Sequence, residues 1–225
     1  LQSILGFSEL GLMRTQAESK LSGMFNDIHS SGQRMLILVN DLLDMSKIDS
    51  VLSHATFTRM DARQLVREVE SELAPLLRAR LVKFEARLPE NPVMLKADAL
   101  RIHQVLRNVV ANALKFSSPG QKIIAGLDTA LPGTVHFYVQ DEGCGIPQNE
   151  LENIFEPFIQ SSLTKDGSGG TGLGLAICRR IVQAHGGNIH AENIPTGGAI
   201  FHIHIPQGIR SEEHTSELQS PMFIS

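Results

Sequence analysis

Three short motifs follow one another in the second half of this 225-residue chain, and they constrain its fold more than any other feature. The first is Asn108-Val-Val-Ala-Asn112-Ala-Leu-Lys115-Phe116, the second is Asp141-Glu-Gly143-Cys-Gly145-Ile146-Pro, and the third is the glycine-rich run 167–175. Each motif is weak alone. In this order they predict a nucleotide site with a metal ligand, a group that reads adenine and a loop that covers phosphates.

The first motif lies in an apolar stretch with helical periodicity. Asn108 and Asn112 are four residues apart and therefore share one helix face, and Lys115 follows one turn later. Amide oxygens and an ammonium group on one face suit a hydrated Mg²⁺ and the phosphates that it bridges. The alternative is an ordinary solvated helix face.

The second motif begins where an apolar strand ends. A carboxylate at Asp141 can accept a hydrogen bond from an exocyclic amine, and Gly143 and Gly145 let the backbone approach a planar ring closely. An ordinary turn would look the same.

The third motif spells G-x-G-x-x-G over 167–172. A dinucleotide-binding reading needs an apolar strand directly before it, but 160–166 is polar, and no Lys-Ser or Lys-Thr pair follows Gly172 as a P-loop requires. The remaining interpretations are a flexible loop whose N–H groups wrap phosphates at the start of the helix at Leu173, or a plain surface loop.

Composition excludes several function classes. The net charge of −4 offers no basic patch for nucleic acid. No apolar run approaches the roughly 18–20 residues needed to cross a bilayer, so we expect no membrane contact within this chain. Cys144 and Cys178 match no metal-binding spacing and are expected to be reduced thiols of a cytosolic domain.

The first fifty residues predict an antiparallel helical hairpin. Helices are expected over 1–13 and 21–48, and apolar residues recur every seven positions at Leu21, Ile28, Met35 and Leu42. This spacing favours a bundle seam over ordinary packing within one domain.

Residues 51–209 predict a two-layer α+β sandwich, because helices alternate irregularly with strands joined by hairpins. Expected helices cover 61–80, 98–116 (capped by Asp98) and 173–185, and expected strands cover 56–59, 81–88, 93–96, 123–127, 135–140, 188–193 and 199–205. Residues 210–225 have no periodicity and are interpreted as a disordered or non-biological tail.

The motifs in this order, together with Phe155-Glu-Pro-Phe158, resemble the N, G1, F and G2 boxes of sensor histidine kinases. The stretches 1–10 and 40–49 are similar to parts of their two dimerisation helices, so the resemblance covers residues 1–207. It implies a helical hairpin, half of a dimeric four-helix bundle, followed by a Bergerat-type ATP-binding sandwich.

The resemblance also implies roles for individual residues. Asn112 would coordinate Mg²⁺, with Asn108 and Lys115 contacting the phosphates of ATP or the waters of the metal, and Asp141 would bind the adenine amino group. The other expected site residues shape the adenine pocket, anchor the lid or close over the phosphates, and they are Phe116, Gly143, Gly145, Ile146, Phe155, Phe158, Lys165, Gly170, Thr171, Gly172, Leu173 and Gly174.

The chemistry implied is transfer of the γ-phosphate to a histidine and then to a response-regulator aspartate. Relatives that hydrolyse ATP place a glutamate where this chain has Asn108, and an amide is no general base near neutral pH. An ATPase of this fold and a degenerate nucleotide-binding dimerisation scaffold are the alternatives.

None of the nine histidines has the sequence context of the family's acceptor, which is expected upstream of Leu1. The implied partners are a second copy of the chain, through the hairpin, and a receiver domain of a response regulator. The implied location is cytoplasmic, in a parent protein that the resemblance allows to be anchored in the cell membrane.

Overall fold

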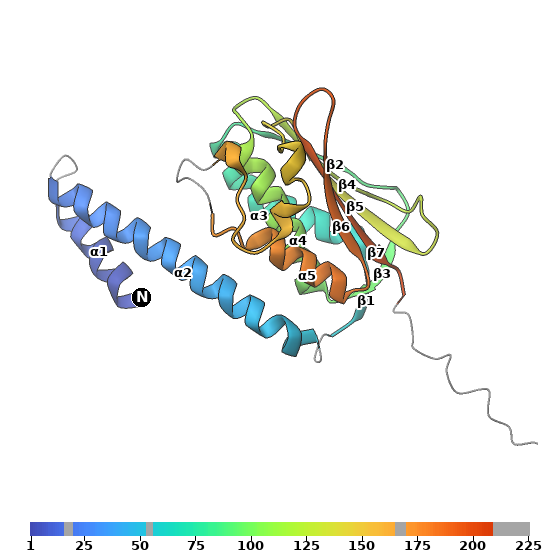
Figure 1. Cartoon of the computed structure of the whole chain (residues 1–225), viewed down its shortest axis with the longest axis horizontal. Coiled ribbons are helices and arrows are strands. Elements are labelled where there is room, and N and C mark those ends of the chain that lie inside the picture. The colour runs from blue at the N-terminus through green and yellow to red at the C-terminus, as the bar shows by residue number, and fades with distance from the viewer. Residues whose placement is uncertain (16–19, 53–55, 165–169, 209–225) are drawn as a thin grey trace, which may run out of the picture.

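A computed structural model describes residues 1–15, 20–52, 56–164 and 170–208, without the side chains of 44–52 and 164. The chain begins with an antiparallel pair of helices, α1 (Gln2–Arg14) and α2 (Lys20–Leu52), which pack along each other (Figure 1). Between them, Ser8 is buried and its hydroxyl lies 3.1 Å from Nδ1 of His29. The predicted hairpin is confirmed.

The second part is an α/β sandwich. Its helices are α3 (Ala62–Ala79), α4 (Ala99–Phe116) and α5 (Gly174–Ala184), with short 3-10 turns η1 (Gln148–Glu150), η2 (Asn153–Phe155) and η3 (Ser162–Thr164). Its strands are β1 (Thr58–Asp61), β2 (Lys83–Arg87), β3 (Met94–Ala97), β4 (Lys122–Asp128), β5 (Thr134–Asp141), β6 (Asn188–Asn193) and β7 (Ala199–Pro206).

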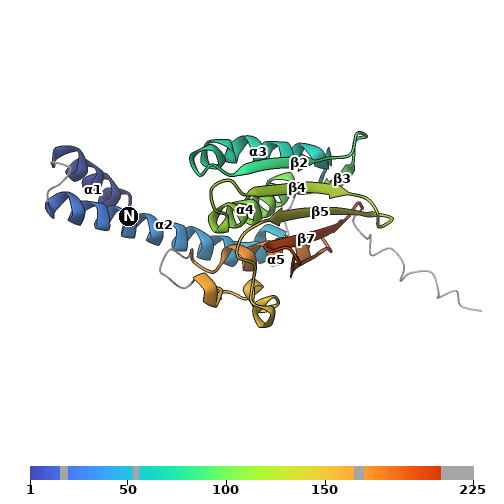
Figure 2. The same ribbon diagram turned by 90° about the horizontal axis from the view of Figure 1, so that it is seen from above.

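Five strands form the main sheet in the order β2-β4-β5-β7-β6, in which β2 and β4 are parallel and the other neighbours antiparallel. β1 and β3 form a separate antiparallel pair. Helices α3, α4 and α5 lie together on one face of the main sheet (Figures 1 and 2), which gives the two layers of the predicted α+β class.

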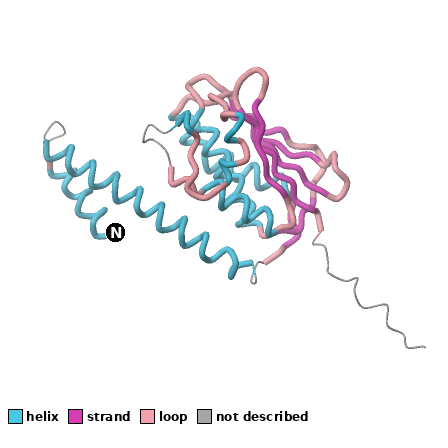
Figure 3. Tube along the Cα trace, in the orientation of Figure 1, coloured by secondary structure: helices cyan, strands magenta, loops and turns pink. Residues whose placement is uncertain are grey.

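Alternation along the strands separates a core face from an outer face. In β5, Val135, Phe137 and Val139 are buried against the helices, while the residues between them lie on the other face. In Figure 3 the helices of the sandwich lie on one side of the sheet.

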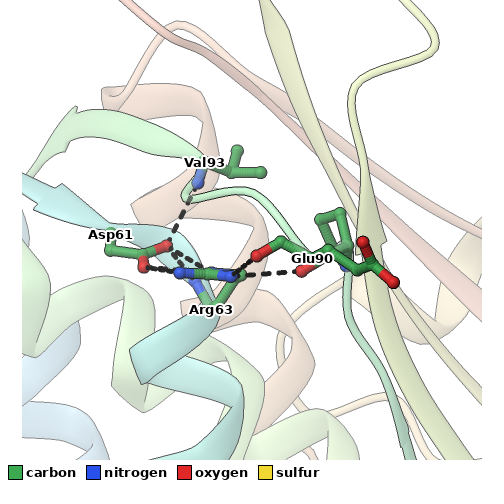
Figure 4. A network of polar contacts seen from close by, with 5 residues as sticks. Asp61, Arg63, Glu90 and Val93 are labelled. Carbon is green, nitrogen blue, oxygen red and sulfur yellow. Dashed lines mark hydrogen bonds and ion pairs between the residues drawn. The ribbon is translucent and has the colours of Figure 1, made fainter.

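Two aspartates start the helices that support the site. Asp61 accepts a hydrogen bond from the Arg63 amide at 3.1 Å, and Asp98 accepts one from the Arg101 amide at 3.2 Å, so each caps its helix. Figure 4 shows that the Asp61 carboxylate also binds the Arg63 guanidinium and the Val93 amide, while Arg63 reaches the carbonyl of Glu90. The cap predicted at Asp98 is confirmed.

The predicted elements agree with the observed ones to within a few residues at each end. The 210–225 segment, for which a tail was expected, lies outside the described residues. None of the described helices combines the length and the apolar character needed to cross a membrane.

Candidate nucleotide site

The three motifs meet at one cavity of about 560 Å³, within the range of small-molecule sites. It lies between α4, the loop after β5, the start of α5 and one side of α2. Expected site residues that line it are Asn108, Asn112, Lys115, Phe116, Asp141, Gly145, Ile146, Gly170, Thr171, Gly172 and Gly174.

Other expected site residues lie next to the cavity without lining it. Leu173 and Phe155 are buried in the core, and Gly143 forms the turn behind Asp141. The Phe158 side chain is 61% exposed, so this residue reaches the glycine loop through its backbone and not its ring. Lys165 lies outside the described residues.

Helix α4 carries the polar wall of the cavity. Its apolar face is buried, which directs Asn108 and Asn112 away from the core. Asn108 also hydrogen bonds the thiol of Cys178, whose pKa burial raises to about 12. An added Cβ on Gly174 would lie 3.9 Å from the side-chain nitrogen of Asn108. The first turn of α5 therefore lies against the face of α4 that carries Asn108.

Asp141 is the buried carboxylate of the site, only 5% exposed at the end of β5. Its Oδ1 accepts hydrogen bonds from the amides of Gly143 at 2.8 Å and Ala199 at 3.4 Å. Burial raises the pKa of Asp141 above its usual range, and the two amide donors oppose this shift. The carboxylate is thus held in place while retaining acceptor capacity toward the cavity.

The loop that follows Asp141 is fastened by Asn193, at the end of β6. The Asn193 side chain accepts from the Ile146 amide at 2.8 Å and donates to the Ile146 carbonyl at 2.6 Å. Gly145 adopts a φ of +72°, which favours glycine. Sequence analysis missed Asn193, because a contact across 47 residues leaves no local pattern.

The glycine-rich loop is pinned at its described end. The Phe158 amide donates to the Gly172 carbonyl at 2.9 Å, and Gly172 has a φ of +72°. A side chain on Gly172 would lie 2.9 Å from the Phe158 backbone. Thr171 accepts from the Leu173 amide at 3.1 Å, which satisfies one free N–H at the start of α5.

The hairpin forms one wall of the cavity, which the motifs did not predict. Ile37, Asn40 and Asp41 of α2 line it, and the Thr171 hydroxyl donates to Asp41 Oδ2 at 2.6 Å. The bonded residues are 130 positions apart. The spacing of apolar residues along α2 was the only local signal, and it marks a different side of the helix.

The donor set fits a triphosphate carried with Mg²⁺. In the described part of the chain, no group of three or more His, Cys, Asp or Glu side chains is arranged to hold a metal ion. Mg²⁺ usually keeps several waters and is bound through few protein ligands plus substrate phosphates, so a cavity with few protein oxygens, among them the Asn112 amide, is compatible with this ion. Backbone N–H groups at the start of α5 suit the phosphates.

Comparison with known families agrees with this geometry. Residues 97–209 match the family described as "Histidine kinase-, DNA gyrase B-, and HSP90-like ATPase", and residues 1–51 match the "His Kinase A (phospho-acceptor) domain". The chain is 34% identical to the alginate biosynthesis sensor protein KinB of Pseudomonas aeruginosa, over 84% of this chain and 31% of KinB. It is 35% identical to the sensor histidine kinase WalK of Bacillus subtilis, over 82% of this chain and 30% of WalK. The chain thus spans less than a third of these relatives.

Solved structures with the same fold include full-length ShkA in complex with AMPPNP, with a TM-score of 0.74, 27% identity and coverage of 90% of this chain and 42% of ShkA. The catalytic domain of the histidine kinase ThkA gives a TM-score of 0.61 and 35% identity, covering 68% of this chain and 96% of that domain. ThkA in complex with the response regulator protein TrrA gives 0.70 and 27%, covering 93% and 58%.

Proposed function

Because this chain belongs to the sensor histidine kinase family and joins a His Kinase A domain to an ATPase-type catalytic domain, we propose that it binds ATP with Mg²⁺ and directs the γ-phosphate to a histidine. The observation that carries this proposal is the single cavity lined by Asn112, Asp141 and the glycine loop. We further propose that residues 1–50 form the dimerisation hairpin and that residues 51–209 form the catalytic domain.

Each wall of the cavity has one task in this proposal. Asp141 accepts a hydrogen bond from the adenine amino group, and Asn193 keeps the adjoining Ile146 loop in position. Asn112 holds Mg²⁺, which neutralises phosphate charge when bound. Lys115 and Asn108 contact the phosphates, and the Gly170–Gly174 loop covers them.

Asn108 favours phosphate transfer over hydrolysis. Its amide cannot take a proton from water near neutral pH, and its side chain instead hydrogen bonds the thiol of Cys178 on α5. Positioning and charge neutralisation are the main means of catalysis in phosphoryl transfer, so no general base is required at this position.

We also propose that none of the nine histidines is the acceptor. His29 is the histidine to consider first, because it lies on a helix of the hairpin, α2. Its Nδ1 lies 3.1 Å from the Ser8 hydroxyl and its Nε2 lies 2.9 Å from the Gln33 amide nitrogen, so both ring nitrogens have partners. Phosphorylation of Nε2 would therefore first require its contact with Gln33 to break.

The central test is calorimetry with Mg²⁺ and a non-hydrolysable ATP analogue. We expect binding to the wild-type chain, strongly weakened by Asn112→Ala and unchanged by Asn91→Ala, an exposed asparagine between β2 and β3. No binding to the wild-type chain would refute the proposal and favour the degenerate scaffold. Sustained release of phosphate from ATP would favour the ATPase.

The histidine claim has its own test. Incubation of the chain with radiolabelled ATP is expected to give no acid-labile phosphate on the protein itself. Label at His29 that disappears in His29→Gln would show that the acceptor lies within this chain. The nucleotide-binding proposal would survive that result.

We propose two protein partners. A second copy would pack against the apolar side of the hairpin, as expected of a His Kinase A domain. A response-regulator receiver domain would take the phosphate, and the ThkA structure with its response regulator TrrA supports this choice. Because the proposed response regulator would be a cytoplasmic partner, we propose a cytoplasmic location for this chain.

A further inference from the structure

Four histidines gather on the outer face of the main sheet, away from the nucleotide cavity. β5 carries His136, β7 carries His202 and His204, and β6 carries His190. The strand register places His136 directly opposite His204, and His190 directly opposite His202. The rings stack in the same pairs, with centroids 4.4 Å and 4.9 Å apart.

Two of these rings form a hydrogen-bonded chain between carboxylates. Nδ1 of His136 lies 3.0 Å from Oδ2 of Asp128, and Nε2 of His136 lies 2.9 Å from Nδ1 of His202. Nε2 of His202 then lies 3.2 Å from Oε1 of Glu192. The chain runs Asp128–His136–His202–Glu192 across β4, β5, β7 and β6.

Counting hydrogens fixes the charge of this chain. An ionised carboxylate only accepts, so His136 Nδ1 and His202 Nε2 must each carry a hydrogen. The contact between the two rings needs one further hydrogen, on one nitrogen or the other. One plus one plus one is three hydrogens on two rings, where two neutral imidazoles carry one each. The pair therefore holds a single positive charge.

We propose that the outer face of the sheet carries a proton-binding site, in which His136 and His202 share one proton between Asp128 and Glu192. Loss of this proton removes one of the three hydrogen bonds. Uptake of another sets two N–H groups against each other at 2.9 Å and opens the chain. The site thus accommodates one shared proton, and uptake of a second proton by the pair is unfavourable.

The two flanking histidines make the site more sensitive to acid. Burial lowers the pKa of His190 and of His204, and the neighbouring histidines lower both further. Nearby groups on the same face are Tyr138 on β5, Glu85 and Arg87 on β2, and Lys122 on β4. Asp128 and Glu192 oppose the shifts, but they are already bonded to the shared pair.

Acid should destabilise the folded chain through His190 and His204. A histidine with a lowered pKa binds a proton more weakly in the folded chain than in the unfolded chain, so acid favours unfolding. The stability that the two neutral rings contribute is present above their unfolded pKa of about 6.5. It is lost as the pH falls from there through their lower folded pKa. A metal-site interpretation is disfavoured, because the stacked rings do not converge on one point and no metal-holding group is found among the described residues.

Ring-nitrogen NMR of the whole chain tests the shared proton. We expect hydrogens on Nδ1 of His136 and on Nε2 of His202, and a third hydrogen shared between the two facing ring nitrogens. Glu192→Gln keeps an acceptor but removes a charge, so the third hydrogen should be held less strongly and the nitrogen shifts of both rings should change. Two neutral rings without the third hydrogen in the folded chain, or no change at His136 in Glu192→Gln, would overturn the proposal.

Unfolding by urea at pH 7.5 and pH 5.5 tests the acid sensitivity. His204→Phe preserves ring stacking without a titratable group, so this variant should lose less stability on acidification than the wild-type chain. His103→Phe, on α4 beside Glu72, serves as the control and should not reduce the acid loss in this way. Equal losses in wild type and His204→Phe, or a marked rise in melting temperature with zinc chloride at pH 7.5, would contradict the proton site.

Discussion

The most unusual single residue is Asp141, because a buried carboxylate with a raised pKa opposes folding in the pH range where it functions. The folded chain binds the Asp141 proton more tightly than the unfolded chain, so ionisation above the ordinary pKa of 3.8 costs stability. The amides of Gly143 and Ala199 offset part of this cost. A charge retained at this cost indicates a need for a strong acceptor facing the cavity.

Asp141→Asn separates stability from binding. The asparagine oxygen still accepts from the Gly143 amide, so we expect the free energy of unfolding at pH 7 to stay equal or rise by about 1 kcal/mol. Nucleotide affinity should fall by roughly 10- to 100-fold, because a charge-assisted hydrogen bond is lost. Urea unfolding and calorimetry measure the two effects. A strongly destabilised variant would mean that Asp141 is chiefly structural.

Nucleotide affinity should also depend on pH through Asp141. Protonation removes the negative charge of the carboxyl group and weakens it as an acceptor, and the raised pKa means that this begins at a higher pH than for an ordinary aspartate. We therefore expect affinity to decline on acidification in the wild-type chain, and to decline less in Asp141→Asn. Calorimetry at several pH values, with an adenosine analogue that has no phosphates to titrate, isolates this effect. Parallel declines in both proteins would assign it elsewhere.

At the scale of elements, the glycine loop offers a matched pair of substitutions. Gly172 has a φ of +72°, and an added Cβ would lie 2.9 Å from the Phe158 backbone, whereas a Cβ on Gly170 meets nothing within 4 Å. Gly172→Ala should cost about 1–2 kcal/mol in stability or in closure over the nucleotide. Gly170→Ala should stay within about 0.5 kcal/mol. Thermal melts with and without nucleotide compare them, and similar behaviour of the two variants would argue against a fixed turn at Gly172.

Elements specified by local chemistry were predictable from the sequence. The four-residue spacing of Asn108 and Asn112 placed both on the cavity side of α4, and Asp98 marked the start of that helix. The parallel pairing of β2 with β4 and the contacts of Asn193 and Asp41 were not predictable. These contacts join segments that meet only after the chain has folded, so neither residue spacing nor local propensity predicts them.

At the scale of the whole molecule, the hairpin carries a row of apolar side chains that the described part of the chain leaves exposed. Leu21, Ile28, Met35 and Leu42, the residues predicted as a seam, are each 46–58% exposed. Such a stripe favours association, and burial of one such side chain contributes about 1.5–3 kcal/mol. Ile28→Glu should therefore weaken dimerisation at least tenfold in sedimentation experiments. Leu100→Glu, on the exposed start of α4, is the control. A concentration-independent monomer in the wild-type chain would contradict the dimer.

The bond between Asp41 and Thr171 makes the nucleotide cavity a property of both parts of the molecule. Asp41 lines the cavity from α2 and accepts from the Thr171 hydroxyl, which in turn accepts from the Leu173 amide at the start of α5. Any movement of α2 relative to α5 therefore alters a wall of the site and the support of its glycine loop. The same carboxylate places a negative charge where a triphosphate is proposed to bind.

Asp41→Asn distinguishes these two effects of Asp41. The amide oxygen still accepts from Thr171, so the geometry is retained while a charge of the same sign as the phosphates is removed. We expect nucleotide affinity to rise by roughly 2- to 10-fold, and the gain to shrink at high salt. Asp41→Ala also frees Thr171 and should give a smaller gain or a loss. The double-mutant cycle with Thr171→Val measures the coupling, which should be near zero for Asp41→Asn and clear for Asp41→Ala. If none of the three substitutions changes the nucleotide affinity, α2 does not influence the nucleotide site in solution.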